Sequence, residues 1–249
     1  MQAKEISQEL HLSYIAANID ELCKEAKATK ISHKDFLLDI FEREIENRRS
    51  NRLQKRLKDA HFPFKKYLQD LDLEEYSKEI RDEIEDLMTL KFVDDKANVI
   101  CIGNPGRGKT HLAIALGVAA GLADKRVLFT NVPNLVIELK EAMSKNEITY
   151  YKRKFERYEL VIIDELGYVS FDKQGNEILF NLLSNRNEMG SMIITTNLVF
   201  EEWEEVFGDA KLTGALVDRL AYKAHVLDMS GDSYRLKETK EWLERQVSI

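Results

Sequence analysis

The sequence of 249 residues has little cysteine and little proline, and it has no apolar run near the roughly 20 residues that a membrane-spanning helix needs. Its two cysteines, Cys23 and Cys101, are too few for a disulfide framework. The five histidines are scattered, so we predict no structural metal. The first ten residues are charged and lack the apolar stretch of a secretory signal. We therefore expect a cytoplasmic protein that does not bind membranes.

Glycine is missing from the first part of the chain. All 11 glycines lie at or after Gly103, and Pro63 is the only proline among the first 102 residues. Since glycine and proline mark turns, this scarcity predicts long helices, and apolar residues recur at helical spacing within residues 10–28 and 36–45. We expect a small helical N-terminal domain over residues 1–66 and a second domain over residues 67–249.

Charge also divides the chain. Lys and Arg number 37 and Asp and Glu 44, and the net charge of −7 taken whole argues against a polyanionic partner such as nucleic acid. By segment, residues 31–66 and 101–159 each carry +4, whereas residues 67–100 and 160–249 each carry −7. Positive charge is therefore local, and the overall acidity does not exclude DNA.

The second domain alternates short apolar runs with helical stretches. The runs with strand length and composition are residues 99–102, 127–130, 160–164, 192–196 and 225–229. The intervals between them are long enough for crossover helices. This pattern predicts an α/β domain, with a mainly parallel sheet covered by helices on both faces.

A phosphate-binding loop follows the first of these runs. The residues fit G-x-x-x-x-G-K-[ST] and are Gly103, Asn104, Pro105, Gly106, Arg107, Gly108, Lys109 and Thr110, with His111 directly after them. A strand leads in and a helix leads out, so the backbone N–H groups should converge on phosphate oxygens. We expect Lys109 to reach the β- and γ-phosphates of ATP and the Thr110 hydroxyl to ligate Mg²⁺.

Two carboxylates, Asp164 and Glu165, end the apolar run that starts at Leu160. Open α/β sheets bind ligands at the carboxyl ends of their strands. Asp164 is therefore predicted to hold Mg²⁺, and Glu165 to polarise the water that attacks the γ-phosphate. Asn197 follows the next run and is a candidate for orienting that water, with Thr196 as the next candidate, although a turn or helix cap is a competing interpretation.

Basic residues recur along the predicted helix before Pro63. Arg48, Arg52 and Arg56 are spaced i, i+4 and i+8, with Arg49 and Lys55 beside them. A stripe of cations at that spacing suits the phosphates of duplex DNA, with salt-dependent binding largely indifferent to base sequence. The alternative is an ordinary solvated helix face.

Several longer runs carry a family resemblance. GNPGRGKTHLAIALG, VIIDELGY, MIITTNLVFEEWEEVFGD and LVDRLAYKAHVLDMSGDSYRLK resemble the IstB family of insertion-sequence ATP-binding proteins, relatives of the helicase loader DnaC and of the initiator DnaA. The resemblance covers roughly residues 35–240. The run DRL…HV…GDSYR is much more specific to the family than the phosphate-binding loop.

The resemblance implies an AAA+ P-loop ATPase with a five-stranded parallel sheet in the order 5-1-4-3-2. It implies homo-oligomers with ATP between subunits, and Arg219 resembles the arginine finger given to a neighbouring site; pairing with Asp218 is the alternative. Arg235 is a candidate same-subunit phosphate sensor, and we expect no C-terminal helical lid. By analogy with initiators, Lys145, Lys152, Arg153 and Lys154 are candidate DNA contacts.

Three functions compete at this point. The first is an ATPase that oligomerises on duplex DNA and recruits or activates a transposase. The second is a helicase-loading adaptor in DNA replication, acting through its N-terminal helices. The third is a small-molecule kinase or other NTPase, against which the adjacent Asp164 and Glu165 argue, because they favour hydrolysis over transfer to an acceptor.

Overall fold

The computed structural model describes residues 3–169, 171–231, 233–234, 239 and 242–243. It consists of two compact units, residues 1–55 and residues 56–249. Helix α3 (His33–Asp59) runs through this boundary. The sequence placed the boundary at 66/67, after Pro63. Residues 56–66 belong to the second unit because Arg56 pairs with Asp124 at 2.7 Å and the Ala60 carbonyl accepts the Phe129 N–H at 2.8 Å.

The first unit is helical, as predicted, and its core is small. It contains α1 (Ala3–Glu9), α2 (Ser13–Thr29) and most of α3. Among the described residues of this unit, Ile15, Leu22 and Ile40 form the buried apolar cluster. The buried Glu44 of α3 accepts the backbone N–H groups of Tyr14 and Ile15, at 2.9 and 3.2 Å, so its carboxylate caps the start of α2.

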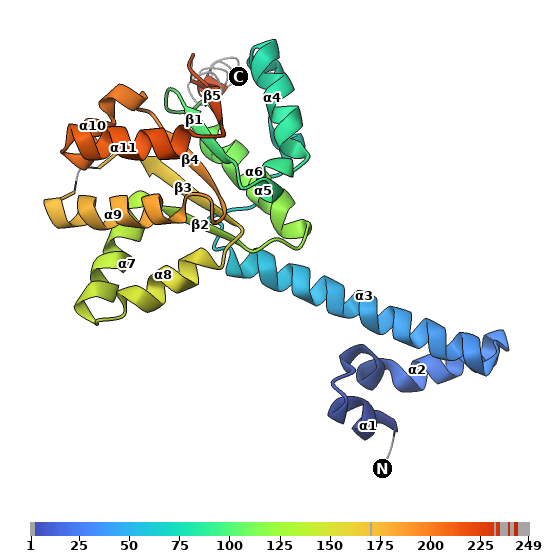
Figure 1. The fold of residues 1–249 in the computed structure, drawn as a ribbon. Helices are drawn as coiled ribbons and strands as arrows, with labels where there is room; N and C mark the ends of the chain where they lie inside the picture. Colours follow the sequence, from blue (N-terminus) through green and yellow to red (C-terminus); the bar gives the residue numbers. More distant parts are fainter. Residues whose placement is uncertain (1–2, 170, 232, 235–238, 240–241, 244–249) are drawn as a thin grey trace. The chain divides into compact units, whose positions relative to one another are not determined.

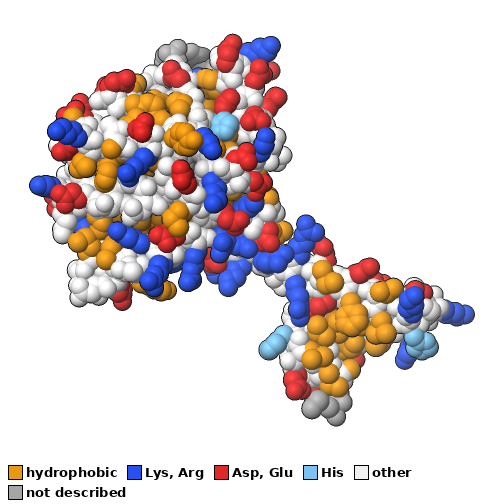
Figure 2. Space-filling model, viewed as in Figure 1, with side chains coloured by type: hydrophobic (Ala, Val, Ile, Leu, Met, Phe, Trp, Pro, Cys, Tyr) orange, Lys and Arg blue, Asp and Glu red, His pale blue; other side chains and the backbone are white. Residues whose placement is uncertain are grey.

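Large apolar side chains lie on the surface of this unit. Figure 2 shows them gathered over the helices of the first unit, where the exposed members are Ile6, Leu10, Ile31, Leu37, Leu38, Phe41 and Ile45. On a three-residue core, burial contributes little stability, so the capping carboxylate and the ion pairs of α3 matter more here than in a large domain.

The second unit contains the sheet. Its strands are β1 (Asn98–Ile102), β2 (Val127–Asn131), β3 (Leu160–Leu166), β4 (Ser191–Thr196) and β5 (Ala224–Asp228). All neighbours pair in parallel, in the order β2-β3-β4-β1-β5. This confirms the predicted order, read from the opposite edge. β1 and β4 are buried along their whole length, which explains their continuous apolar sequence.

Helices cover both faces of the sheet (Figure 1). One face packs on a cluster with side chains from α4 (Lys78–Met88), α5 (Lys91–Asp94) and α6 (Lys109–Leu122). The other packs on a cluster with side chains from α7 (Val132–Ser144), α8 (Ile148–Glu156), α9 (Lys173–Arg186), α10 (Glu204–Phe207) and α11 (Ala210–Ala221). Short 3-10 turns are η1 (Leu68–Asp70), η2 (Leu73–Glu75) and η3 (Phe200–Trp203).

Among the described residues, no helix is long and apolar enough to cross a membrane. The expectation that no helical lid follows β5 concerns residues that lie largely outside those described.

Candidate functional site

The glycine-rich loop connects β1 to α6 and lies against the segment after β5. Gly103 has φ +148°, and a Cβ there would lie 2.5 Å from the carbonyl carbon and oxygen of Met229. Gly106 and Gly108 have φ +82° and +80°. These left-handed conformations, and the close approach at Gly103, explain why glycine occupies these positions.

Lys109 and Thr110 begin α6, directly after the loop. The Lys109 side chain is 7% exposed, and its Nζ donates to the carbonyls of Gly103 at 2.5 Å and Asn104 at 2.9 Å. The ammonium group therefore lies within the curve of the loop. The N-terminus of a 14-residue helix adds N–H donors and a partial positive charge at the same place.

Asp164 links this helix to two strands. Its Oδ1 accepts the Thr110 hydroxyl at 2.8 Å and the Thr195 hydroxyl at 2.6 Å, and the side chain is 5% exposed. The carboxylate and the Thr110 hydroxyl are hard oxygen ligands, held together from separate elements. They are the donor set that Mg²⁺ prefers in phosphate-binding sites, so the residues present fit that ion.

Glu165 lies at an irregularity in β3. The three-residue step from Ile163 to Leu166 of β3 lies opposite the two-residue step from Ile194 to Thr196 of β4, which indicates a β-bulge. Glu165 has φ +64°, unusual for a residue with a side chain. Its N–H donates to the Thr195 hydroxyl at 3.0 Å, and its carboxylate is exposed. The bulge therefore turns Glu165 out of a buried strand.

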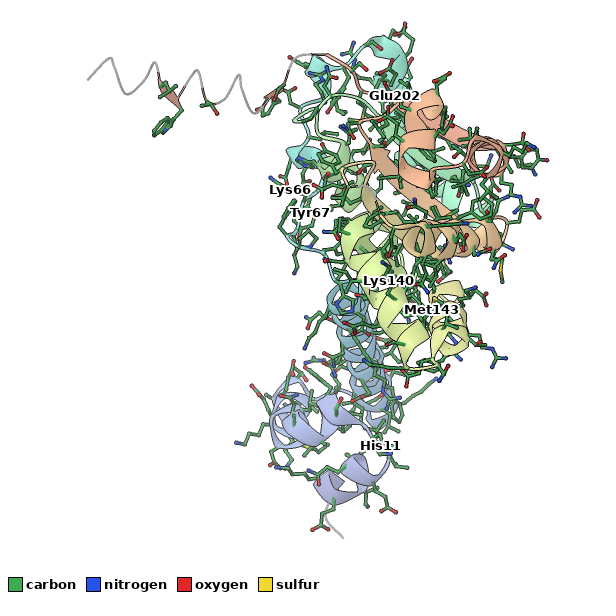
Figure 3. All side chains as sticks on the ribbon, turned by 90° about the vertical axis from the view of Figure 1, so that its left-hand side faces the viewer. His11, Lys66, Tyr67, Lys140, Met143 and Glu202 are labelled. Carbon is green, nitrogen blue, oxygen red and sulfur yellow. The ribbon has the colours of Figure 1, made fainter. Side chains whose placement is uncertain are left out.

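Lys109, Thr110 and Glu165 line one pocket of about 360 Å³, in the size range of small-ligand sites, and Asp164 is not part of its lining. One wall is residues 105–111 with Glu165 and Thr195. A second wall, which sequence reasoning missed, includes Phe64, Lys66, Asp70, Leu71, Asp72, Tyr76, Tyr168 and Tyr234. Figure 3 labels Lys66 and Tyr67 on this segment before α4.

Tyr76 connects this second wall to the glycine-rich loop by direct contacts with Arg107. Its hydroxyl donates to the Arg107 carbonyl at 2.7 Å, and the Arg107 guanidinium lies 5.3 Å from its ring centroid. The segment after β5 adds two bonds, from the Tyr234 N–H to the Gly106 carbonyl (3.2 Å) and from the Asn104 amide to the Gly231 carbonyl (3.1 Å). Two chain segments distant in sequence thus hold the loop.

His111 lies beside the same wall. Its Nε2 is 3.4 Å from the Tyr67 carbonyl oxygen. Burial lowers the pKa of His111 below its ordinary value, because it outweighs the opposing effect of that carbonyl. The imidazole is therefore neutral at pH 7.

Of the other predicted site residues, Asn197 and Arg219 do not line this pocket. The Asn197 Oδ1 is buried with no hydrogen-bond partner among the described residues. Thr195, two residues earlier, faces the pocket instead. Arg219 is exposed in the last turn of α11, and within the described ranges its side chain makes no ion pair, including none with Asp218. Arg235 lies outside the described residues.

The basic residues of α3 differ in their contacts. Arg48 donates to Glu44 at 2.9 Å and to the His11 carbonyl at 2.7 Å, and Arg56 donates to Asp124 at 2.7 Å. Both are thus engaged inside their own units. Arg49, Arg52 and Lys55 are exposed. The predicted stripe is therefore not uniformly available to a ligand.

The second group of basic residues lies at the end of α7 and on α8. Lys145 is 3.7 Å from Glu141, while Arg153 and Lys154 are exposed and Lys152 is half-buried. Figure 3 labels Lys140 and Met143 on the preceding helix α7. The nearby Phe155 is buried, which leaves Tyr150, 70% exposed, as the prominent aromatic side chain of α8.

Comparison with known proteins identifies close relatives by sequence. Residues 5–242 match the family described as IstB-like ATP binding protein. A protein named as the ATP-binding protein of insertion sequence IS21 from Pseudomonas aeruginosa is 36% identical over 231 residues, covering 93% of this chain and 86% of its own. The corresponding protein of insertion sequence IS5376 from Geobacillus stearothermophilus is 32% identical, covering 97% and 96%.

The fold is also found among solved structures. AMPPCP-bound DnaA from Aquifex aeolicus superposes with a TM-score of 0.57 at 16% identity, covering 72% of this chain and 55% of that one. At this identity the likeness establishes the fold alone.

Proposed function

Because the chain belongs to the family of IstB-like ATP-binding proteins, we propose that it is a Mg²⁺-dependent ATPase that oligomerises on duplex DNA and recruits or activates a transposase. The observation that carries the ATPase part is the Asp164 carboxylate. It joins the phosphate-binding loop, through Thr110, to the strand end that presents Glu165.

Binding of ATP would use the loop and the start of α6. The backbone N–H groups of residues 103–110 and the helix N-terminus would receive the phosphates. Lys109 Nζ would exchange its bonds to the Gly103 and Asn104 carbonyls for bonds to phosphate oxygens. Tyr76, whose hydroxyl bonds the Arg107 carbonyl, would hold the loop in position.

Hydrolysis would then use the two acids differently. Thr110 and Asp164 would hold Mg²⁺, which supplies charge neutralisation of the phosphates when bound. The exposed Glu165 carboxylate would accept a proton from water as the water oxygen attacks the γ-phosphorus. The bond from the γ-phosphorus to the bridging oxygen would break, releasing ADP and phosphate.

Arg219 is proposed to act on a neighbouring subunit. It is exposed, makes no ion pair within the described part of the chain, and does not line the pocket of its own subunit. An arginine supplied in trans stabilises the charge that develops on the transferred phosphoryl group. Hydrolysis would therefore depend on assembly.

DNA binding is proposed to use the cations that are exposed on each unit. Among the predicted DNA contacts these include Arg49 and Lys55 on α3, and Arg153 and Lys154 on the second unit. The names of the relatives place those proteins in insertion sequences, which favours a role in DNA transposition for this chain. Contacts of this kind would be made to phosphates rather than to bases.

The experiment compares wild type, Lys109→Ala and Glu165→Gln with long duplex DNA. We expect wild type to hydrolyse ATP, and Lys109→Ala to lose ATP binding. Glu165→Gln should bind ATP but hydrolyse it at least about 100-fold more slowly, because the general base is absent. It should therefore accumulate as a DNA-bound oligomer in sedimentation.

Affinity capture with the trapped Glu165→Gln oligomer tests the partner. Recovery of a transposase would support the proposal. Recovery of a replicative helicase instead would select the helicase-loading function. An ATPase rate unaffected by DNA would contradict the dependence of hydrolysis on assembly on DNA, and would favour a simple NTPase.

A further inference from the structure

The Thr195 hydroxyl bonds to both acidic residues of the proposed ATPase site. It donates to Asp164 Oδ1 at 2.6 Å and accepts the backbone N–H of Glu165 at 3.0 Å. The side chain is 2% exposed, yet it belongs to the lining of the nucleotide pocket. One hydroxyl on β4 therefore connects the predicted magnesium ligand with the predicted general base.

The bond to Glu165 is made at a point where the backbone conformation is unfavourable for a residue with a side chain. Glu165 has φ +64°, and β3 carries an extra residue at this point relative to β4. The bulge takes the Glu165 N–H out of the regular ladder with β4, and the Thr195 hydroxyl accepts it instead. A conformation of this kind persists only when surrounding contacts maintain it.

The bond to Asp164 fixes the direction in which the Thr195 hydroxyl donates its hydrogen. Asp164 accepts from Thr110 and from Thr195 on the same oxygen. Since the carboxylate is an acceptor only, the Thr195 hydroxyl hydrogen must point toward Asp164, and its lone pairs then face the Glu165 N–H. Each group of the chain Thr110, Asp164, Thr195, Glu165 thus orients the next.

From this geometry we propose that Thr195 is a positioning residue for ATP hydrolysis. Its hydroxyl stabilises the bulge that orients the Glu165 carboxylate toward the attacking water. Through its second bond, the same hydroxyl links the orientation of Glu165 to the position of Asp164. The inference rests on the proposed ATPase function. It assigns to Thr195 a role distinct from that predicted for Asn197, which lies outside the pocket lining.

The test compares three variants in the full chain with ATP, Mg²⁺ and DNA. Thr195→Val keeps the shape and removes the hydroxyl, and Thr195→Ser restores it. The matched control is Ser191→Ala, which removes another buried hydroxyl from β4, one that donates to the Phe92 carbonyl at 2.9 Å at the opposite end of the strand.

We expect Thr195→Val to lower kcat about 10- to 100-fold, the usual loss for a supporting contact, with the Kd for ATP changed by less than about 3-fold. Thr195→Ser should recover most of kcat, and Ser191→Ala should leave it unchanged. Combining Thr195→Val with Glu165→Gln should lower kcat no further than Glu165→Gln alone, because Thr195 acts through Glu165.

Hydrogen exchange of nucleotide-free protein gives a readout independent of activity. The Glu165 amide should exchange faster in Thr195→Val than in wild type or Ser191→Ala. Wild-type kcat in Thr195→Val, or an additive double variant, would overturn the positioning role alone. A wild-type protein that binds but never hydrolyses ATP would overturn the proposed function, and this role with it.

Discussion

The nucleotide pocket and the basic stripe of α3 were both predicted from short sequence patterns, but their side chains are held differently. In the pocket, Thr110 and Asp164 are 54 positions apart and meet at 2.8 Å. On α3, Arg48 and Arg56 bond to their own units, while Arg49 and Lys55 point to solvent. A motif with fixed spacing thus identifies a site more reliably than a charge pattern, since arginine serves structure and binding equally well.

The largest expected effect is on the ATPase rate and concerns Arg219, which we propose acts at the nucleotide pocket of a neighbouring subunit. Arg219→Ala should lower the ATPase rate of the DNA-bound oligomer by about 10³-fold, because the developing phosphoryl charge loses its trans partner. Nucleotide binding by isolated subunits should not change. Steady-state ATPase assays at saturating DNA measure this effect.

Mixing provides the control for Arg219. Arg219→Ala mixed with Glu165→Gln should regain activity, since some interfaces then pair an intact Arg219 with an intact Glu165. Absence of any recovery, with oligomers of normal size, would place Arg219 outside the neighbour's site.

The next effect is on the stability of the first unit and concerns Arg48, the arginine of the stripe that bonds to Glu44. Arg48→Ala should destabilise the first unit by about 1–2 kcal/mol, because the buried Glu44 loses a charged hydrogen bond while it still caps α2. Hydrogen exchange of residues 13–29 in the full chain should accelerate.

Arg49→Ala is the matched control for Arg48→Ala. Arg49 is the neighbouring residue and is exposed, so its removal should leave that exchange within experimental error. Equal acceleration of exchange in both variants would show that the contact between Arg48 and Glu44 does not stabilise α2.

Acid should weaken the first unit through the same carboxylate. Burial alone would raise the pKa of Glu44, but bonds from Arg48, Ile15 and Tyr14 outweigh it and hold the pKa below its ordinary value. The stability that Glu44 contributes is therefore present above about pH 4.5, the ordinary pKa, and is lost as pH falls through the lower folded value. Circular dichroism from pH 6 to 3 should show a smaller loss of helix in Glu44→Gln than in wild type.

The smallest effect is on DNA affinity. Arg49→Ala should weaken binding to duplex DNA only a few-fold and reduce the salt dependence of binding by about one released ion, uniformly across sequences. Fluorescence anisotropy at several salt concentrations measures both quantities. An unchanged salt slope would remove Arg49 from the DNA interface.

Much of the fold was predictable from sequence because its signals are local. Continuous apolar runs identified all five strands, and the resemblance supplied their order, which the structure confirms. The second pocket wall was not predictable, because Tyr76 reaches Arg107 across 31 positions without any motif. The contacts of Thr195 were not predictable either, because its hydroxyl bonds to Asp164 across 31 positions without any motif.

The central claim is that ATP binding at Lys109 controls DNA binding elsewhere on the chain. The most direct measurement is the affinity for long duplex DNA at moderate salt, with and without ATP, for wild type and Lys109→Ala. The account predicts that ATP tightens DNA binding by wild type and has no effect on Lys109→Ala. Equal DNA binding by the two proteins in the presence of ATP would contradict it.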